Sequence, residues 1–149
     1  MTDFDKIYVA KAYNDIAPHF AQTRTYLWSG VVDFYKLIPN SSFIADIGCG
    51  NGKNIDNSHT KEKNLICIGC DITQFFLEVC NKENKSVIAA NNLHLPFKDN
   101  FFDAVLSVAV IHHFSNHADR IKAIQEIYRI TKPNGIFLIQ IWAQEQESD

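Results

Sequence analysis

Short apolar runs alternate with stretches of helical spacing along most of the chain. The apolar runs predict strands at 42–47, 65–70, 86–90, 102–108 and 136–142. The stretches between them predict helices at 52–58, 73–81 and 117–131. Strands separated by helical crossovers favour a parallel sheet with right-handed connections and helices on both faces. The pattern therefore predicts an α/β fold built on a doubly wound parallel sheet.

Two local patterns refine this prediction. Residues 102–111 are nearly continuously apolar, which is typical of a central strand covered on both faces. Pro133, Asn134 and Gly135 favour a helix end followed by a turn, because proline cannot continue a helix and glycine commonly follows one. We therefore expect the last strand to begin at residue 136.

The first 40 residues predict a helical segment ahead of the sheet. Apolar positions at helical spacing precede Pro18, and a second helix is expected from about 26 to 37, ending before the next proline. The chain has no internal repeat, low-complexity tract or linker. It is therefore predicted to be a single domain over 1–149, with a helical preamble at 1–40 and a nucleotide-binding core at 41–149.

Composition limits the classes of function. The 149 residues carry a formal charge of −3, with 46% hydrophobic and 21% charged residues, as in a globular domain. Such a chain has no overall field that attracts a polyanion, so a nucleic-acid substrate would require a local basic patch or a partner. No apolar stretch reaches about 18 residues, and the N-terminus lacks a signal-peptide core. We expect no membrane association and a cytoplasmic location, with the nucleus as an alternative.

The cysteines and histidines do not predict a metal site. Cys67 and Cys70 form a C-x-x-C spacing, but a second ligand pair is missing and alternation along a strand points them to opposite faces. We interpret them as small buried apolar residues. The histidines at 112, 113 and 117 are interpreted as surface and helix-capping positions, and no metal is predicted.

The most informative motif lies at 46–53. Gly48, Gly50 and Gly52 follow an apolar strand, and Asp46 lies two residues before the first glycine. Glycine tolerates positive φ and leaves backbone N–H groups open to a ligand. The spacing G-x-G-x-G differs from the dinucleotide fingerprint G-x-G-x-x-G. It resembles motif I of the class I S-adenosylmethionine-dependent methyltransferases; the alternative is a tight turn without a ligand.

This resemblance implies that S-adenosylmethionine binds where the first strands end. Gly48, Gly50 and Gly52 would lie under its methionine part, and Asp46 would meet its ammonium group, directly or through water. Asp71, at the end of the second strand, would accept hydrogen bonds from both ribose hydroxyls. The alternative role for Asp71 is to cap the helix that follows it.

The third and fourth strands add the remaining parts of the cofactor site. Asn91 would accept from the adenine amino group, Asn92 follows it, and Leu93 would cover the ring. Backbone carbonyls of Ser107 and Val108 would hold the ammonium group. The alternative is that the two asparagines are only turn residues. The succession of glycine turn, acid one strand later and polar pair one strand after that favours the cofactor site.

Further segments resemble one particular family; they are 13–24, 93–98, 108–115 and 141–146. With the glycine motif, they are similar to the eukaryotic tRNA wobble-uridine carboxymethyl methyltransferases and to the methyltransferase domain fused to an AlkB-type dioxygenase in animals. The resemblance implies a Rossmann-like sheet with strand order 3-2-1-4-5. It also implies that the chain forms the methyl ester of 5-carboxymethyluridine at the anticodon wobble position of tRNA.

The resemblance also implies candidate catalytic residues. A carboxylate is already ionised at neutral pH and needs no general base, so catalysis should consist mostly of positioning. Arg24 would hold the substrate carboxylate, His113 would donate to that carboxylate or to a phosphate, and Trp142 would stack on the wobble base. His19 and Tyr13 would lie near the pocket. The alternatives are a surface ion pair for Arg24 and core packing for Trp142.

Family members work with a small zinc-binding activator protein, which adds a strand to the edge of the sheet. In this chain the corresponding edge is 86–90, whose apolar residues suit strand addition. The chain departs from the family pattern at Asn91, where aspartate is usual, and at Ser29, which replaces a proline.

The sequence stops at residue 149, so we expect the last two strands of the class to be missing. An apolar edge at Ile139 and Ile141 would then be open to pairing. Two alternatives to a tRNA enzyme remain. One is a small-molecule carboxyl or O-methyltransferase, and the other is a catalytically incomplete fragment that binds only cofactor or activator.

Overall fold

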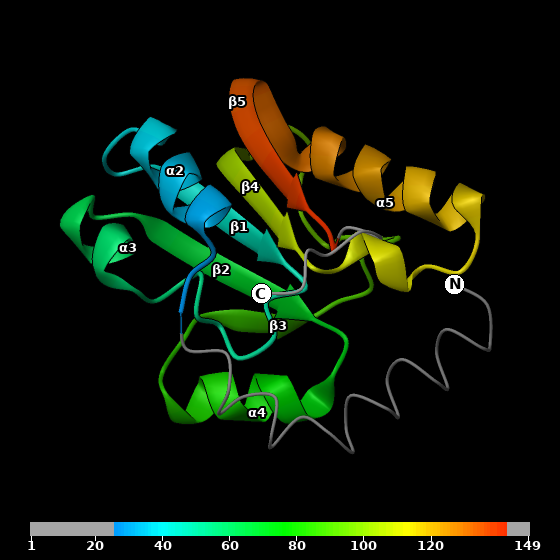
Figure 1. Cartoon of the computed structure of the whole chain (residues 1–149), viewed down its shortest axis with the longest axis horizontal. Coiled ribbons are helices and arrows are strands. Elements are labelled where there is room, and N and C mark those ends of the chain that lie inside the picture. The colour runs from blue at the N-terminus through cyan, green and yellow to red at the C-terminus, as the bar shows by residue number, and fades with distance from the viewer. Residues whose placement is uncertain (1–25, 143–149) are drawn as a thin grey trace, which may run out of the picture.

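A computed structural model describes residues 26–142 and contains a five-stranded sheet with the order β3-β2-β1-β4-β5 (Figure 1). All neighbouring strands run parallel, which confirms the predicted doubly wound sheet and its strand order. The strands are β1 Phe43–Ile47, β2 Ile66–Asp71, β3 Val87–Ala89, β4 Phe102–Val108 and β5 Thr131–Gln140. Four of them lie close to their predicted ranges.

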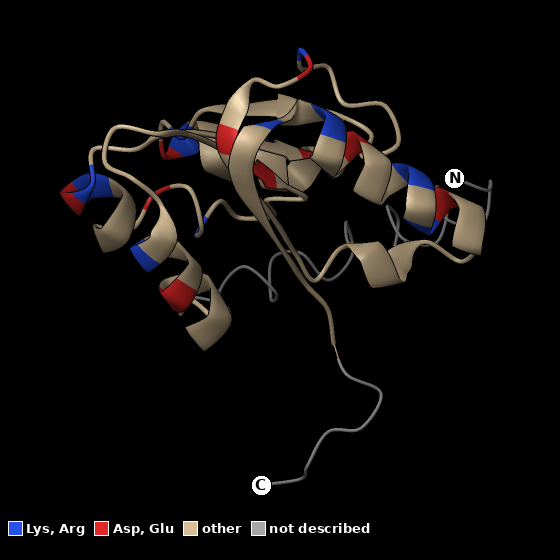
Figure 2. Cartoon of the chain, turned by 90° about the horizontal axis from the view of Figure 1, so that it is seen from above, with Lys and Arg blue, Asp and Glu red and all other residues tan. Residues whose placement is uncertain are grey.

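The helices lie around this sheet in chain order: α2 Ser29–Leu37, α3 Ser58–Glu62, α4 Gln74–Lys82, the 3-10 turn η2 Ile111–His113 and α5 His117–Ile130. Figure 2 shows both acidic and basic residues on α5, but Glu126 is buried, and the exposed residues of this helix include Lys122, Ile124 and Tyr128. None of the helices in the described region is long and apolar enough to cross a membrane.

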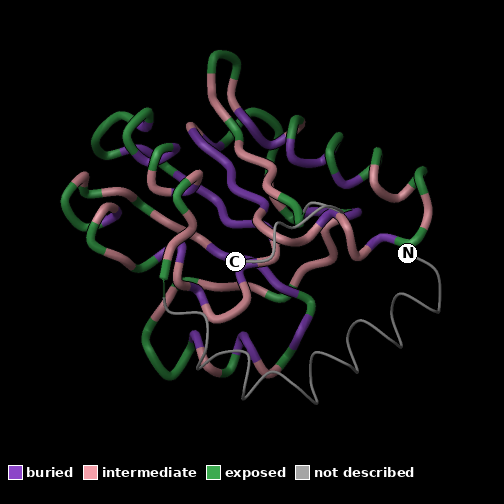
Figure 3. The backbone as a smooth tube through the Cα atoms, viewed as in Figure 1, coloured by how far each residue is buried: buried purple, intermediate pink, exposed green. Residues whose placement is uncertain are grey.

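The core consists of two clusters, one on each face of the sheet. Alternate residues of β1 and β4 enter the two clusters, so that Ile44 packs with α2 and Ala45 packs with α5. Figure 3 shows β1 and β4 buried along most of their length, as expected for central strands. Cys67 joins the α2 cluster and Cys70 the α5 cluster, which confirms that their side chains point to opposite faces.

The predicted helix at 52–58 is wrong. Residues 49–56 form successive turns, and α3 begins only at Ser58. The reason is local capping: the Asn57 side chain accepts the Thr60 N–H at 3.2 Å while the Thr60 hydroxyl accepts the Asn57 N–H at 3.0 Å. This reciprocal pair starts the helix at 58 and leaves the glycine segment as a series of turns.

The last strand also differs from the prediction. α5 ends at Ile130 and β5 begins at the next residue, so Pro133–Gly135 lies inside the strand rather than at the helix end. Thr131 pairs with Phe102 and Ile136 with Ala104, which shows that the intervening residues bulge out of the ladder. Asn134 adopts a φ of 65° in this bulge. The strand ends at Gln140, two residues earlier than expected.

Candidate active site

The glycine segment forms a loop between β1 and α3 with an exposed backbone surface. Gly48, Gly50 and Gly52 have φ values of 80°, 52° and 71°. A Cβ added to Gly48 would lie 2.4 Å from Val110, and one added to Gly52 would lie 2.9 Å from Cys80, whereas one added to Gly50 would meet nothing within 4 Å. The loop is therefore packed at both ends and open in the middle, where a ligand can approach the backbone.

Asp71 links this loop to the end of β2. Its Oδ2 accepts the Gly50 N–H at 2.9 Å, and its Oδ1 accepts the Thr73 N–H at 2.8 Å. The N-cap of α4 is Thr73, so Asp71 is not the capping residue, although it does order the turn that enters the helix. Each carboxylate oxygen keeps a lone pair for another donor, so the predicted role towards a ribose diol fits the geometry.

Asp46 is fully buried at the end of β1. Asn54 donates to its Oδ2 at 3.0 Å, while Oδ1 has no hydrogen-bond partner among the described residues. Burial raises the pKa of Asp46 to about 7, and the nearby Asp71 charge adds to the shift. A buried carboxylate with an unused oxygen fits a cationic or hydrogen-bonding group of a ligand better than an apolar one.

Asn54 was not singled out in the sequence. Its backbone carbonyl accepts the Tyr35 hydroxyl, and its amide reaches Asp46, so one residue joins α2 to the glycine loop. Desolvation raises the pKa of Tyr35, which keeps its hydroxyl protonated as a donor. Asn54 is a polar residue in a loop with no repeating pattern, which explains why sequence reasoning missed it.

The loop is also supported from the side of α4. The Cys80 thiol contacts the Gly50 carbonyl at 3.3 Å, and Lys85 Nζ donates to the Asn51 carbonyl at 2.9 Å. Hydrogen bonding to Cys49 lowers the pKa of Cys80, with Lys85 contributing. These contacts fix the side of the loop that faces the protein.

The structure places residues 91–93 next to Asp71. Asp71 pairs with Ala89 across β2 and β3, and its carbonyl accepts the Ala90 N–H at 3.0 Å. Asn91 Oδ1 accepts the Leu93 N–H at 3.0 Å, and the Asn91 carbonyl accepts the His94 N–H at 2.9 Å. Asn91 therefore forms a tight turn, as the alternative interpretation proposed, and its second Oδ1 lone pair remains for a ligand.

The other two residues of this turn differ in burial. Asn92 is half-buried, whereas Leu93 is buried in the α5-side cluster. Covering of an adenine ring by Leu93 stays a prediction. The described residues thus bring together the carboxylate predicted for the ribose and the turn predicted for the base.

The fourth predicted part lies at the end of β4. Ser107 is fully buried, its Oγ has no hydrogen-bond partner among the described residues, and Val108 is half-buried. Asp46 pairs with Leu106, so alternation directs the Ser107 side chain to the face opposite Asp46. The two side chains do not converge, and only the backbone near Ser107 and Val108 lies at the ligand end of the sheet.

Two of the three predicted catalytic residues belong to the described region; Arg24, like His19 and Tyr13, lies outside it. His113 is half-buried in η2, with its ring 4.2 Å from that of His112. Burial and the neighbouring His112 lower the pKa of His113 to about 4. His113 is therefore neutral at pH 7 and can donate only one N–H.

Trp142 follows β5 and is 43% exposed, which argues against a role as ordinary core. Its ring packs edge-on against Trp28, with centroids 5.2 Å apart, and Lys53 Nζ lies 5.9 Å from the centre of the Trp28 ring. Trp28 precedes α2, Lys53 lies in the glycine loop and Trp142 follows β5, so three distant segments meet here. Neither Trp28 nor Lys53 was identified from the sequence, because each becomes informative only through this contact.

Metal ligands do not gather in the described part of the chain. No group of three or more histidine, cysteine, aspartate or glutamate side chains within 26–142 could hold a metal ion.

A parallel 3-2-1-4-5 sheet, with a glycine loop after its first strand and a carboxylate after its second, defines the class I methyltransferase architecture. Residues 45–139 match the family described as "Methyltransferase domain", and the chain belongs to this family. The enzymes of this class take their methyl group from S-adenosylmethionine, so the prediction of the cofactor is confirmed at the level of the family.

Individual proteins similar to this chain carry a more specific name than the family does. The chain is 41% identical over 145 residues to the "tRNA (carboxymethyluridine(34)-5-O)-methyltransferase" of Arabidopsis thaliana, covering 97% of this chain and 35% of that protein. It is 38% identical over 143 residues to the protein of the same name from Saccharomyces cerevisiae, covering 95% of this chain and 50% of the other. The chain therefore spans half or less of the length of these relatives.

One similar solved structure is a complex between the Haloferax volcanii Trm112 methyltransferase activator and a methyltransferase. The TM-score is 0.73 at 19% identity, over 88% of this chain and 59% of that one. At this identity the similarity establishes the fold alone.

Proposed function

We propose that this chain is the cofactor-binding core of a tRNA methyltransferase that forms the methyl ester of 5-carboxymethyluridine at the wobble position. The observation that carries the proposal is the identity of about 40% over nearly the whole chain to proteins of that name. The local geometry supports it, since the glycine loop, Asp71 and the Asn91 turn occupy neighbouring strand ends. A tRNA substrate fits a cytoplasmic location, with the nucleus as the alternative.

The proposed site has a place for each part of S-adenosylmethionine, which supplies an activated methyl group on its sulfonium. The backbone at Gly50 holds the methionine part, and Asp71 accepts the ribose hydroxyls. The turn at Asn91 binds the adenine edge. Asp46 stabilises the positive charge of the ligand, because its unused oxygen lies in a buried environment.

The methyl acceptor is an ionised carboxylate, so the residues around it act by positioning. His113 contributes no charge at pH 7, because its pKa lies near 4, and its ring hydrogen-bonds with the Ala109 backbone. The positive charge that holds the carboxylate must come from another residue, and we assign this role to Arg24.

The aromatic cluster at Trp28 and Trp142 serves as the stacking surface for the wobble base. The exposed ring of Trp142 offers a face to a base, and Trp28 fixes its orientation by the edge-on contact. Lys53 lies beside Trp28 and adds positive charge near a phosphate. This local charge matters because the chain as a whole is acidic.

We also propose that a zinc-binding activator adds a strand to β3. Val87–Ala89 is the end strand of the described sheet, and its residues are half-buried or exposed. The activator complex among the similar structures supports a partner of this kind.

The test is co-expression of the chain with the activator, followed by mass spectrometry of tRNA nucleosides from cells that lack the endogenous enzyme. Appearance of the methyl ester of 5-carboxymethyluridine supports the proposal. Methylation of free carboxylic acids but not of tRNA supports the small-molecule alternative. Binding of S-adenosylhomocysteine in calorimetry without any methyl transfer, with the activator present, supports the incomplete fragment.

A further inference from the structure

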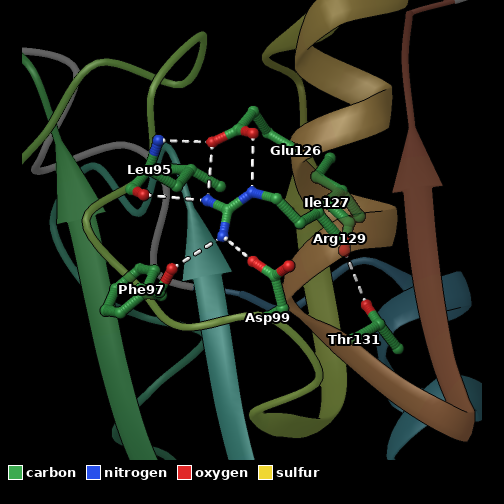
Figure 4. A network of polar contacts seen from close by, with 7 residues as sticks. All are labelled: Leu95, Phe97, Asp99, Glu126, Ile127, Arg129 and Thr131. Atoms are coloured by element: carbon green, nitrogen blue, oxygen red, sulfur yellow. Dashed lines mark hydrogen bonds and ion pairs between the residues drawn. The ribbon is translucent and has the colours of Figure 1, made fainter.

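Two residues of α5, Glu126 and Arg129, form an ion pair with each other and together bind the loop between β3 and β4 (Figure 4). Arg129 Nε donates to Glu126 Oε1 and Arg129 Nη2 donates to Glu126 Oε2, each at 2.8 Å. This two-point contact fixes the plane of the guanidinium group. The plane in turn decides where the remaining donors point.

Those remaining donors all bind the loop. Arg129 Nη2 donates to the Leu95 carbonyl at 2.9 Å, and Nη1 donates to the Phe97 carbonyl at 2.8 Å and to Asp99 Oδ1 at 2.7 Å. All five guanidinium N–H groups are thereby used. Glu126 Oε2 accepts the Leu95 N–H at 2.7 Å, so the pair binds both backbone polar groups of Leu95.

Stability alone does not account for this arrangement. Glu126 is buried while the Arg129 side chain is 30% exposed, and such a partly buried ion pair contributes little net stability compared with well-packed apolar side chains. Such a pair does impose one geometry, because each loop carbonyl has a single, directional partner. Hydrogen bonds from the Arg129 side chain, together with its charge, lower the pKa of Glu126, which keeps the pair ionised.

The attachment extends to the turn of the proposed adenine site. Leu95 is two residues from Leu93, and both side chains lie in the α5-side cluster with Ile127. The Leu93 N–H donates to Asn91 Oδ1 and the His94 N–H donates to the Asn91 carbonyl. Each backbone N–H from Leu93 to Leu95 is therefore hydrogen-bonded, which restricts movement of the turn relative to Leu95. A shift of Leu95 therefore moves the Asn91 side chain.

We propose that Glu126 and Arg129 are positioning residues that set the placement of the Asn91–Leu93 turn and thereby the selectivity of the site for adenine. Neither residue touches the cofactor in this arrangement; both act through the backbone of Leu95. The inference rests on the proposed cofactor site. It adds to that site a control of base selectivity located on α5.

The test compares S-adenosylhomocysteine with S-inosylhomocysteine, whose base carries an oxo group at position 6 and a proton on N1, by calorimetry on the full chain. Glu126→Gln and Arg129→Lys remove the two-point contact with little change in size. Each variant is expected to bind S-adenosylhomocysteine about tenfold more weakly, with the preference over the inosyl ligand reduced by a similar factor. Lys132→Gln is the matched control, since Lys132 pairs with Asp103 at 2.6 Å away from this loop.

The outcomes are distinct. Variants that melt at lower temperature but keep the wild-type affinity and base preference overturn the inference and leave a structural role only. A wild-type chain that binds neither ligand contradicts the proposed cofactor site instead. Hydrogen exchange in the wild type covers the case of variants that do not fold: S-adenosylhomocysteine should slow exchange of the Leu95 amide, and unchanged exchange overturns the inference.

Discussion

Gly50 and Asp71 are joined by a hydrogen bond of 2.9 Å from the backbone N–H of the loop to the carboxylate at the end of β2. The contact fixes the distance between the two parts of the site that are predicted to bind the methionine and ribose portions of one ligand. A second bond, from the Thr73 N–H, holds the same carboxylate against the start of α4. The site is therefore ordered before the ligand arrives.

Replacement of Asp71 tests this double role. Asp71→Asn should weaken binding of S-adenosylhomocysteine by more than about 1 kcal/mol, because the amide replaces an acceptor with a donor facing N–H or hydroxyl groups. Calorimetry measures the change. Asp103→Asn is the control, since Asp103 also accepts a backbone N–H, that of Phe43, but lies at the start of β4. Equal affinity of wild type and Asp71→Asn would remove Asp71 from the ribose site.

Two glycine substitutions separate packing from ligand access. Gly48→Ala places a Cβ 2.4 Å from Val110 at a φ of 80°, and it should destabilise the fold by more than about 2 kcal/mol. Gly50→Ala meets open space and should destabilise by about 1 kcal/mol through its positive φ alone. Denaturant unfolding gives both values.

Gly50→Ala, the less destabilising of the two substitutions, should be the one that weakens ligand binding. Gly50→Ala should lose affinity for S-adenosylhomocysteine, because its methyl group occupies the open surface of the loop. If Gly50→Ala bound the ligand as tightly as wild type, the ligand would not lie on this surface.

Asp46 makes stability depend on pH. Its pKa of about 7 in the folded chain lies above its ordinary value of 3.8, so the folded state binds the extra proton between these values. The contribution to stability is complete below pH 4 and is lost as pH rises through 7. Asp46→Asn should remove this loss and be more stable than wild type at pH 8 by about 2 kcal/mol. The upper limit of the difference is about 1.4 kcal/mol for each unit by which folding raises the pKa of Asp46.

The measurement is the difference in unfolding free energy between wild type and Asp46→Asn at pH 5 and pH 8, which cancels the other titrating groups. A difference that does not change with pH would show that Asp46 titrates in its ordinary range. The cationic cofactor should also release a proton when it binds at pH 7, because it favours the charged carboxylate, and calorimetry in buffers of different ionisation enthalpy detects this release.

The aromatic cluster predicts a separation of tRNA binding from cofactor binding. Trp142→Ala should raise KM for tRNA about tenfold, the loss expected for one stacked base, with the affinity for S-adenosylhomocysteine unchanged. Trp142→Phe keeps a ring and should retain most of the binding. Trp28→Ala should raise KM for tRNA less, because Trp28 acts on the base through the orientation of Trp142. A KM unchanged in Trp142→Ala would place the base elsewhere.

The sequence pattern predicted the sheet because strand identity depends on local properties. The apolar run of β4 and the alternation that separates Cys67 from Cys70 are properties of neighbouring residues, and both predictions were confirmed. The helix at 52–58 failed because Asn57 and Thr60 form a reciprocal cap that outweighs the weak helical pattern before it. β5 begins early because Thr131 follows Ile130 directly into the ladder with Phe102.

The candidate site was only partly accessible from sequence. Glycines and a carboxylate at strand ends have a recognisable spacing, so the loop and Asp71 were identified. Trp28, Lys53 and Asn54 act through partners far away in the chain, and their roles emerge only when the fold brings those partners together.

The support behind the glycine loop has a mechanical consequence. Cys80 and Lys85, which hold the carbonyls of Gly50 and Asn51, belong to the same short stretch of chain that leads into β3. A strand added to the edge of the sheet at Val87 would therefore also restrict movement of the glycine loop, which is proposed to bind S-adenosylmethionine. Binding of the partner and affinity for the cofactor would then be coupled through fewer than ten residues of backbone, from Cys80 to Val87.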